Sequence, residues 1–245
     1  MKRIRELIAT VTLVYPQDPF FVDFEKSCRT NMAKRAAYRS YDDALQVLDS
    51  QSWQILKDKV VAHFRDHRRG QLKQGFFNQL NEAFAYRFLV RNGCTEVAML
   101  PENGTSTPDI RYFEDGRMKH CEVKTLGLSD IEIHRRESQA VSTNAYVELN
   151  EGFFRKLTSS VDAAKAQIDS QNTSGLVYLM VIWDDFALDY YPNYRRKLVK
   201  FCRDQNISDL YFKIGLRGNR RLHITRPWSG EQAHRPRCWR ELGDV

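Results

Sequence analysis

The chain has 245 residues, of which 28% are charged and 42% hydrophobic, so it can bury a full core and has an ordinary globular composition. Its longest apolar run, Leu176 to Trp183, is much shorter than the roughly 18 residues of a membrane-spanning helix, which argues against a membrane protein. The first residues lack an apolar signal core, and the five scattered cysteines form no Cys-x-x-Cys pair. We therefore expect a cytoplasmic protein with reduced thiols.

The net charge of +7 is unevenly distributed. Residues 1–75 carry 14 Lys and Arg against 9 Asp and Glu, residues 76–190 carry 11 against 17, and residues 191–245 carry 13 against 5. Basic ends around an acidic centre are typical of a protein whose carboxylates hold cations and whose Lys and Arg attract phosphates. The alternative interpretation is that the basic ends only aid solubility.

Apolar residues recur at helical spacing in two parts of the N-terminal half. The first stripe predicts one helix from about Tyr41 to Phe64, interrupted by polar Ser52 and ended by Gly70. The second predicts a helix from Gln74 to Arg91, with Gly93 as its C-cap. Residues 8–22 have no clear period.

A strand is predicted over Thr95 to Leu100, followed by a polar loop and then a β-hairpin. Asp115-Gly116 is the hairpin signal, because a two-residue type I′ turn needs positive φ at both central residues. In this register Glu114 faces Arg117, and the numbers of paired residues always sum to 231.

The register places Asp109 directly opposite Glu122, on the same face of the hairpin as Lys124. Cys121 and Val123 point to the other, apolar face. Two opposed carboxylates repel each other and are poor structural partners. Their arrangement makes chemical sense if a divalent cation lies between them.

The second half of the chain alternates helix and strand. Residues 127–150 form a long polar segment, which favours a functional loop. An amphipathic helix over Phe154 to Ile168 and a buried strand over Gly175 to Trp183 follow, so this strand should lie parallel to the strand that carries Glu122. Tyr194 to Cys202 is predicted as a helix with a basic face.

Pro108-Asp109, Glu122-Val123-Lys124 and the preceding helix together resemble the PD-(D/E)xK nuclease superfamily over about residues 71–183. The resemblance implies an α/β fold, with a restriction-endonuclease-like αβββαβ core, a mixed sheet and an additional N-terminal helical region. We therefore divide the chain into a mainly helical extension, residues 1–70, and a nuclease-like domain, residues 71–245, with a basic C-terminal segment.

The same resemblance implies catalysis by Asp109, Glu122, Lys124 and Glu82. Asp109, Glu122, the Val123 carbonyl and Glu82 would bind Mg²⁺ or Mn²⁺, and the products would carry a 5′-phosphate and a 3′-hydroxyl. Glu82 lies opposite the apolar stripe of its helix, so a solvated surface glutamate is an equally weighted alternative. Either Lys165 or Gln167 would add a polar group, and His120 is interpreted as a strand-surface residue.

The expected substrate is nucleic acid, with DNA favoured over RNA, and the chain could act as a homodimer or within a larger complex. Basic residues near the C-terminus are the candidate phosphate contacts: Arg195, Arg196, Lys197, Arg220 and Arg221. Two rival interpretations remain open. The first is a nucleic-acid-binding protein without catalysis, and the second is a surface salt-bridge ladder formed by Asp109, Glu122 and Lys124.

Overall fold

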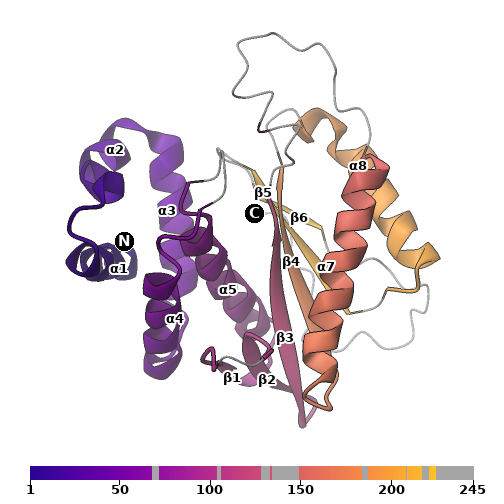
Figure 1. Ribbon diagram of the computed structural model, residues 1–245. Coiled ribbons are helices and arrows are strands. Elements are labelled where there is room, and N and C mark those ends of the chain that lie inside the picture. Colours follow the sequence, from indigo (N-terminus) through magenta and orange to yellow (C-terminus); the bar gives the residue numbers. More distant parts are fainter. Residues whose placement is uncertain are drawn as a thin grey trace.

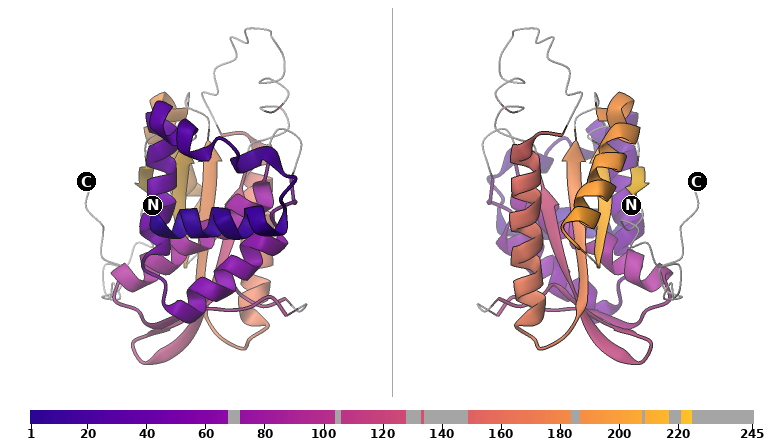
Figure 2. Two further views of the ribbon diagram at one scale, coloured as in Figure 1. Left: turned by 90° about the vertical axis from the view of Figure 1, so that its left-hand side faces the viewer. Right: turned by 90° about the vertical axis from the view of Figure 1, so that its right-hand side faces the viewer.

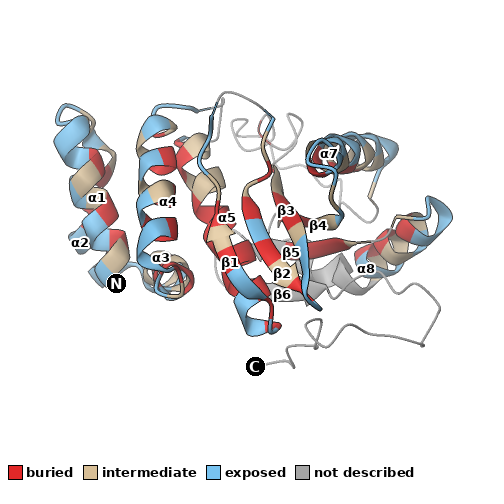
Figure 3. Ribbon diagram, turned by 90° about the horizontal axis from the view of Figure 1, so that it is seen from below, coloured by how far each residue is buried: buried red, intermediate tan, exposed pale blue. Residues whose placement is uncertain are grey.

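The computed structural model describes residues 1–67, 72–103, 106–127, 133, 149–183, 187–207, 209–216 and 221–224. It is an α/β protein in which helices cover both faces of a mixed sheet (Figure 1). Helices α1–α4 form an outer layer, and α5 lies between that layer and one face of the sheet (Figure 3). Helices α7 and α8 cover the opposite face (Figure 2). The boundary proposed at residue 70 lies outside the described residues.

The outer layer consists of α1 (Lys2–Val14), α2 (Phe24–Thr30), α3 (Met32–Leu45) and α4 (Ser50–Ala62), with a short 3₁₀ turn, η1 (Pro19–Phe21). The prediction of one helix over 41–64 was wrong, because the chain leaves α3 after Leu45 and restarts at Ser50. Asp49 caps α4 by accepting hydrogen bonds from the Ser52 N–H at 2.8 Å and the Ser52 hydroxyl at 2.7 Å. The polar break at Ser52 is therefore a helix start, not a defect in a longer helix.

Helix α5 (Gln74–Arg91) has the predicted bounds and is buried almost all round. It contacts the outer helices on one side and the sheet on the other, so its polar positions are enclosed as well as its apolar stripe (Figure 3). One apolar cluster joins residues of α1 to α5 with β1 to β5, including Leu7, Leu56, Leu89 and Ile110. The outer helices thus share a core with the sheet.

The strands are β1 (Thr95–Met99), β2 (Ile110–Glu114), β3 (Arg117–Leu126), β4 (Gly175–Trp183), β5 (Leu210–Leu216) and β6 (Arg221–Ile224), and they are ordered β1-β2-β3-β4-β5-β6. The predicted hairpin register is confirmed, since Glu114 pairs with Arg117 and Ile110 with Cys121. Positive φ angles of 50° at Asp115 and 72° at Gly116 provide the tight turn.

Helix α7 (Glu151–Asp169) returns the chain so that β4 runs parallel to β3, as predicted. Helix α8 (Ala187–Asp204) then leads to β5, which is parallel to β4. A second apolar cluster packs α7 and α8 against the sheet through residues such as Leu157, Leu179 and Leu198. Strands β5 and β6 were not expected from the sequence.

Two further expectations can be compared with the structure. Among the described helices, none has the length and apolar character needed to cross a bilayer. Cys28, Cys94, Cys121 and Cys202 are buried free thiols. The loop predicted over 127–150 lies mostly outside the described residues.

Candidate metal centre

Asp109 immediately precedes β2, one step beyond the pair Ile110–Cys121, so the antiparallel register places it across from Glu122. The Val123 N–H donates a 2.9 Å hydrogen bond to Asp109 Oδ2, which holds the carboxylate against β3. Burial, and after it the negative charge of Asp109, raises the pKa of Glu122. The hairpin therefore places two acidic groups across from each other, as its register predicted.

Glu122 is buried, with 2% of its surface exposed. Its Oε1 accepts a 2.6 Å hydrogen bond from Lys124 Nζ, whereas Oε2 is buried without a hydrogen-bond partner among the described residues. Burial, reinforced by the Asp109 charge and opposed by Lys124, raises the pKa of Glu122 to about 8. A buried carboxylate oxygen without a partner is costly, and a cation ligand would satisfy it.

Lys124 is the most accessible of the three motif side chains, with 28% of its side chain exposed. Its ammonium is held between Glu122 and Gln167, whose Oε1 lies 2.5 Å from Nζ. Gln167 Nε2 in turn donates to the Thr107 carbonyl at 3.5 Å. The structure thus brings Gln167 to the motif, and the alternative that the sequence left open, Lys165, has no such contact with Lys124 among the described residues.

His120 precedes the motif on β3 and is buried rather than on the strand surface. Its Nδ1 lies 2.7 Å from the Thr173 hydroxyl, and burial followed by the nearby Arg111 charge lowers its pKa. His120 therefore joins β3 to the segment before β4, and its contact is structural.

Lys59 is the site residue that sequence reasoning missed. It projects from α4, and its Nζ donates to Glu82 Oε2 at 2.7 Å and to Asp109 Oδ1 at 3.0 Å. Only 4% of its side chain is exposed. Burial lowers the pKa of Lys59, but the two carboxylates outweigh burial, so the pKa ends above its usual value and the ammonium stays charged.

Glu82 is buried, with 4% of its surface exposed, so the alternative of a solvated surface glutamate was wrong. Helix α5 is enclosed on both sides, which explains why the face opposite its apolar stripe is not wet. Burial and then the Asp109 charge raise the pKa of Glu82, while Lys59 opposes this shift. Glu82 belongs to the centre through its ion pair with Lys59.

These groups fit one divalent cation better than two. Within the described ranges, no group of three or more His, Cys, Asp or Glu side chains converges closely enough to hold a metal ion. Asp109 and Glu122 nevertheless retain lone pairs, because each carboxylate offers about four acceptor positions. Mg²⁺ is often held by only one or two carboxylates together with water and substrate phosphate. Asp109 and Glu122 would supply such a pair, and the Val123 carbonyl remains an expectation from the resemblance.

The contacts also bear on the salt-bridge ladder. Lys124 pairs with Glu122, and Asp109 pairs with Lys59 from a different element. The carboxylate partners are largely buried, with 3% of the Glu122 side chain and 16% of the Asp109 side chain exposed. The arrangement is therefore a set of buried ion pairs, not the surface ladder considered from the sequence.

Helix α8 presents the candidate phosphate contacts Arg195 and Arg196 as exposed side chains and Lys197 as a half-buried one. Tyr194 and Leu198 are buried between them and the sheet, as expected for an amphipathic helix. Arg220 lies outside the described residues. Arg221 begins β6, and its side chain is likewise not described.

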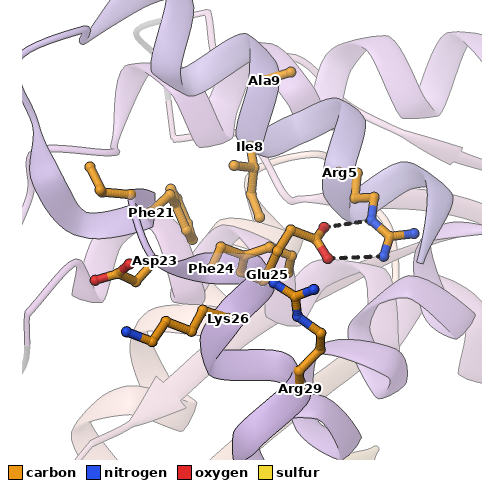
Figure 4. A pocket seen from close by; sticks show the side chains of 10 residues that line it. Arg5, Ile8, Ala9, Phe21, Asp23, Phe24, Glu25, Lys26 and Arg29 are labelled. Atoms are coloured by element: carbon orange, nitrogen blue, oxygen red, sulfur yellow. Dashed lines mark hydrogen bonds and ion pairs between the residues drawn. The ribbon is translucent and has the colours of Figure 1, made fainter.

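A separate open pocket of about 450 Å³ lies at α1 and α2 (Figure 4). An ion pair of 2.7 Å between Arg5 and Glu25 crosses it. Its lining residues include Ile8, Phe21 and Arg29, and none of them belongs to the carboxylate centre.

Comparison of the chain with protein-family models, curated proteins and solved structures found no match.

Proposed function

We propose that the protein is a metal-dependent nuclease with a restriction-endonuclease-like core, and that Asp109 and Glu122 bind one Mg²⁺ or Mn²⁺ ion. The order α5, β1, β2, β3, α7, β4 agrees with the αβββαβ order of the PD-(D/E)xK superfamily. The observation that carries the proposal is the buried Glu122 carboxylate, which has one oxygen on Lys124 and the other without a partner in the described part of the chain. That oxygen lies on a hairpin which also brings Asp109 close.

The cation and Lys124 would have different roles in hydrolysis. When bound, the cation supplies positive charge at the scissile phosphate and makes water a better nucleophile. Lys124, held by Glu122 and Gln167, orients the attacking water and stabilises negative charge that develops in the transition state. Its partial exposure leaves the ammonium accessible to a phosphate group.

The substrate class follows from charge and chemistry. Exposed Arg195 and Arg196 on α8 supply cations that attract a phosphate backbone irrespective of sequence. Nucleic acid has a phosphate backbone that can bind this basic surface and phosphodiester bonds that the centre can hydrolyse. We therefore propose a nucleic-acid substrate, with DNA favoured over RNA.

A cleavage assay with Mg²⁺ and with Mn²⁺ on single- and double-stranded DNA and RNA tests the proposal. We expect Asp109→Asn and Glu122→Gln to lose cleavage by orders of magnitude while remaining folded. Glu114→Gln is the matched control, because Glu114 is a buried carboxylate on the same hairpin that pairs with Lys119 instead. Cleavage that survives Glu122→Gln, or nucleic-acid binding without any cleavage, would contradict the proposal, and the second result would favour a non-catalytic binding protein.

A further inference from the structure

The Lys59 ammonium occupies a position between two acidic groups of the centre. It comes from the outer helical layer and contacts Glu82 on α5 and Asp109 before β2, at 2.7 and 3.0 Å. The exposed fractions of these side chains are 4% for Lys59, 5% for Glu82 and 16% for Asp109. A buried cation thus joins three elements that are far apart in the sequence.

The two halves of the centre differ in how their carboxylate oxygens are satisfied. On one half, Lys59 contacts Glu82 Oε2 and Asp109 Oδ1, and the Val123 N–H contacts Asp109 Oδ2. On the other half, Lys124 contacts Glu122 at Oε1 alone, and Glu122 Oε2 is buried without a partner among the described residues. Each half therefore holds one ammonium, but only the Glu122 half has a buried carboxylate oxygen that lacks a partner among the described residues.

A divalent ion between Glu82 and Asp109 would have to lie against the Lys59 ammonium. Like charges at such separations repel strongly where water is excluded. Moving the ammonium away would leave a buried lysine without its partners, which is also unfavourable. The Lys59 ammonium and a divalent ion therefore compete for the carboxylates of Glu82 and Asp109. Lys59 is part of the chain, so its ammonium is always present at this position.

We propose that the Lys59 ammonium acts as the counter-ion of Glu82 and of one Asp109 oxygen and keeps a divalent cation from binding between them. The centre then binds one divalent cation, on the Glu122 side. Removing the Lys59 charge turns Glu82 and Asp109 into a second divalent-cation site. This inference rests on the proposed function, because it takes Asp109 and Glu122 as the cation-binding pair. It makes Lys59 a positioning residue and changes the role of Glu82 from metal ligand to ion-pair partner.

Calorimetric titration with Mn²⁺, combined with thermal unfolding, tests the inference without an activity readout. We expect the parent protein to bind one Mn²⁺ and Lys59→Met to bind two. The Lys59→Met protein should unfold at a lower temperature without metal, because its buried acidic groups have lost their cation, and should regain more stability on adding Mn²⁺. Lys57→Met is the matched control on the same helix, since Lys57 pairs with Glu6 outside the centre, and should bind one ion.

A second variant keeps the test decisive if Lys59→Met does not fold. Glu82→Gln keeps the Lys59–Asp109 ion pair and removes no proposed ligand, so Mn²⁺ affinity should fall much less than in Glu122→Gln, which removes one. A loss of affinity in folded Glu82→Gln as large as that in Glu122→Gln, or a single ion bound by folded Lys59→Met, would overturn the inference alone. A parent protein that binds no Mn²⁺ would overturn the proposed function itself, and this inference with it.

Discussion

At the scale of single residues, local geometry made part of the centre predictable. The two-residue turn and the alternation of strand faces determine which residues oppose each other, so Asp109 and Glu122 could be paired from the sequence. Lys59 could not be found in this way. It is 23 residues from Glu82 and 50 from Asp109, and only tertiary packing brings it to them.

Glu122 should make the stability of the metal-free protein depend on pH. Burial and Asp109 raise its pKa from an ordinary value of 4.5 to about 8, so the folded state holds a proton that the unfolded chain releases in this window. Stability associated with Glu122 is therefore present below about pH 4.5 and is lost as pH rises towards about 8. Glu122→Gln cannot ionise and should lack this part of the decline.

Thermal unfolding of both proteins in metal-free buffer between about pH 5 and 8 measures this difference. Other titrating groups, such as His63, are common to both proteins and cancel in the comparison. If the stability of parent and variant changed with pH in the same way, Glu122 would be ionised over the whole range, and its pKa would not be raised.

Gln167 should affect the rate of cleavage by orienting the Lys124 ammonium. Gln167→Ala removes the 2.5 Å contact that orients the ammonium, and we expect cleavage to slow by roughly tenfold to a hundredfold with little change in Mn²⁺ affinity. Gln167→Glu should retain an acceptor and recover part of the rate. Lys165→Ala, on the same helix, is the control and should resemble the parent, and equal losses in both alanine variants would point to a general effect on α7.

At the scale of elements, periodicity identified α5, α7 and β4 because each has a continuous pattern, although α7 (Glu151–Asp169) is longer than the predicted Phe154 to Ile168. It failed at the break between α3 and α4, where the apolar spacing continues across a helix start capped by Asp49. It also missed the burial of Glu82, because a helix enclosed on two sides hides polar positions that a single stripe would leave in solvent.

Helix α8 should contribute to nucleic-acid binding through its basic face. Replacing Arg195, Arg196 and Lys197 with Ala should weaken binding and reduce the slope of log affinity against log salt by about one per lost phosphate contact. Replacement of Lys34, Arg35 and Arg39 on α3 removes the same charge from the outer layer and is the matched control. Equal slopes in the two triple variants would show that α8 acts only through net charge.

At the scale of the whole molecule, the outer helices share an apolar core with the sheet. The sequence predicted an N-terminal helical extension, but it contains no signal for where that extension packs. In the structure the larger apolar cluster runs from α1 through α5 into the strands, and Lys59 connects the outer layer to the acidic centre. The outer helices are thus part of the core, and α4 contributes Lys59 to the candidate site.

This shared core predicts that the protein unfolds cooperatively. Leu7 on α1 and Ile168 on α7 lie in the two different clusters on opposite faces of the sheet, with 0% and 3% of their surfaces exposed. Leu7→Ala and Ile168→Ala should each cost about 2–5 kcal/mol, because each leaves a cavity in a packed core. Both should lower the midpoint of one calorimetric transition, since the sheet transmits the loss between its faces.

Leu13→Ala is the control, because Leu13 is 82% exposed and its truncation should change little. Two separate transitions, with Leu7→Ala moving only one of them, would instead identify the outer helices as an independently folding domain.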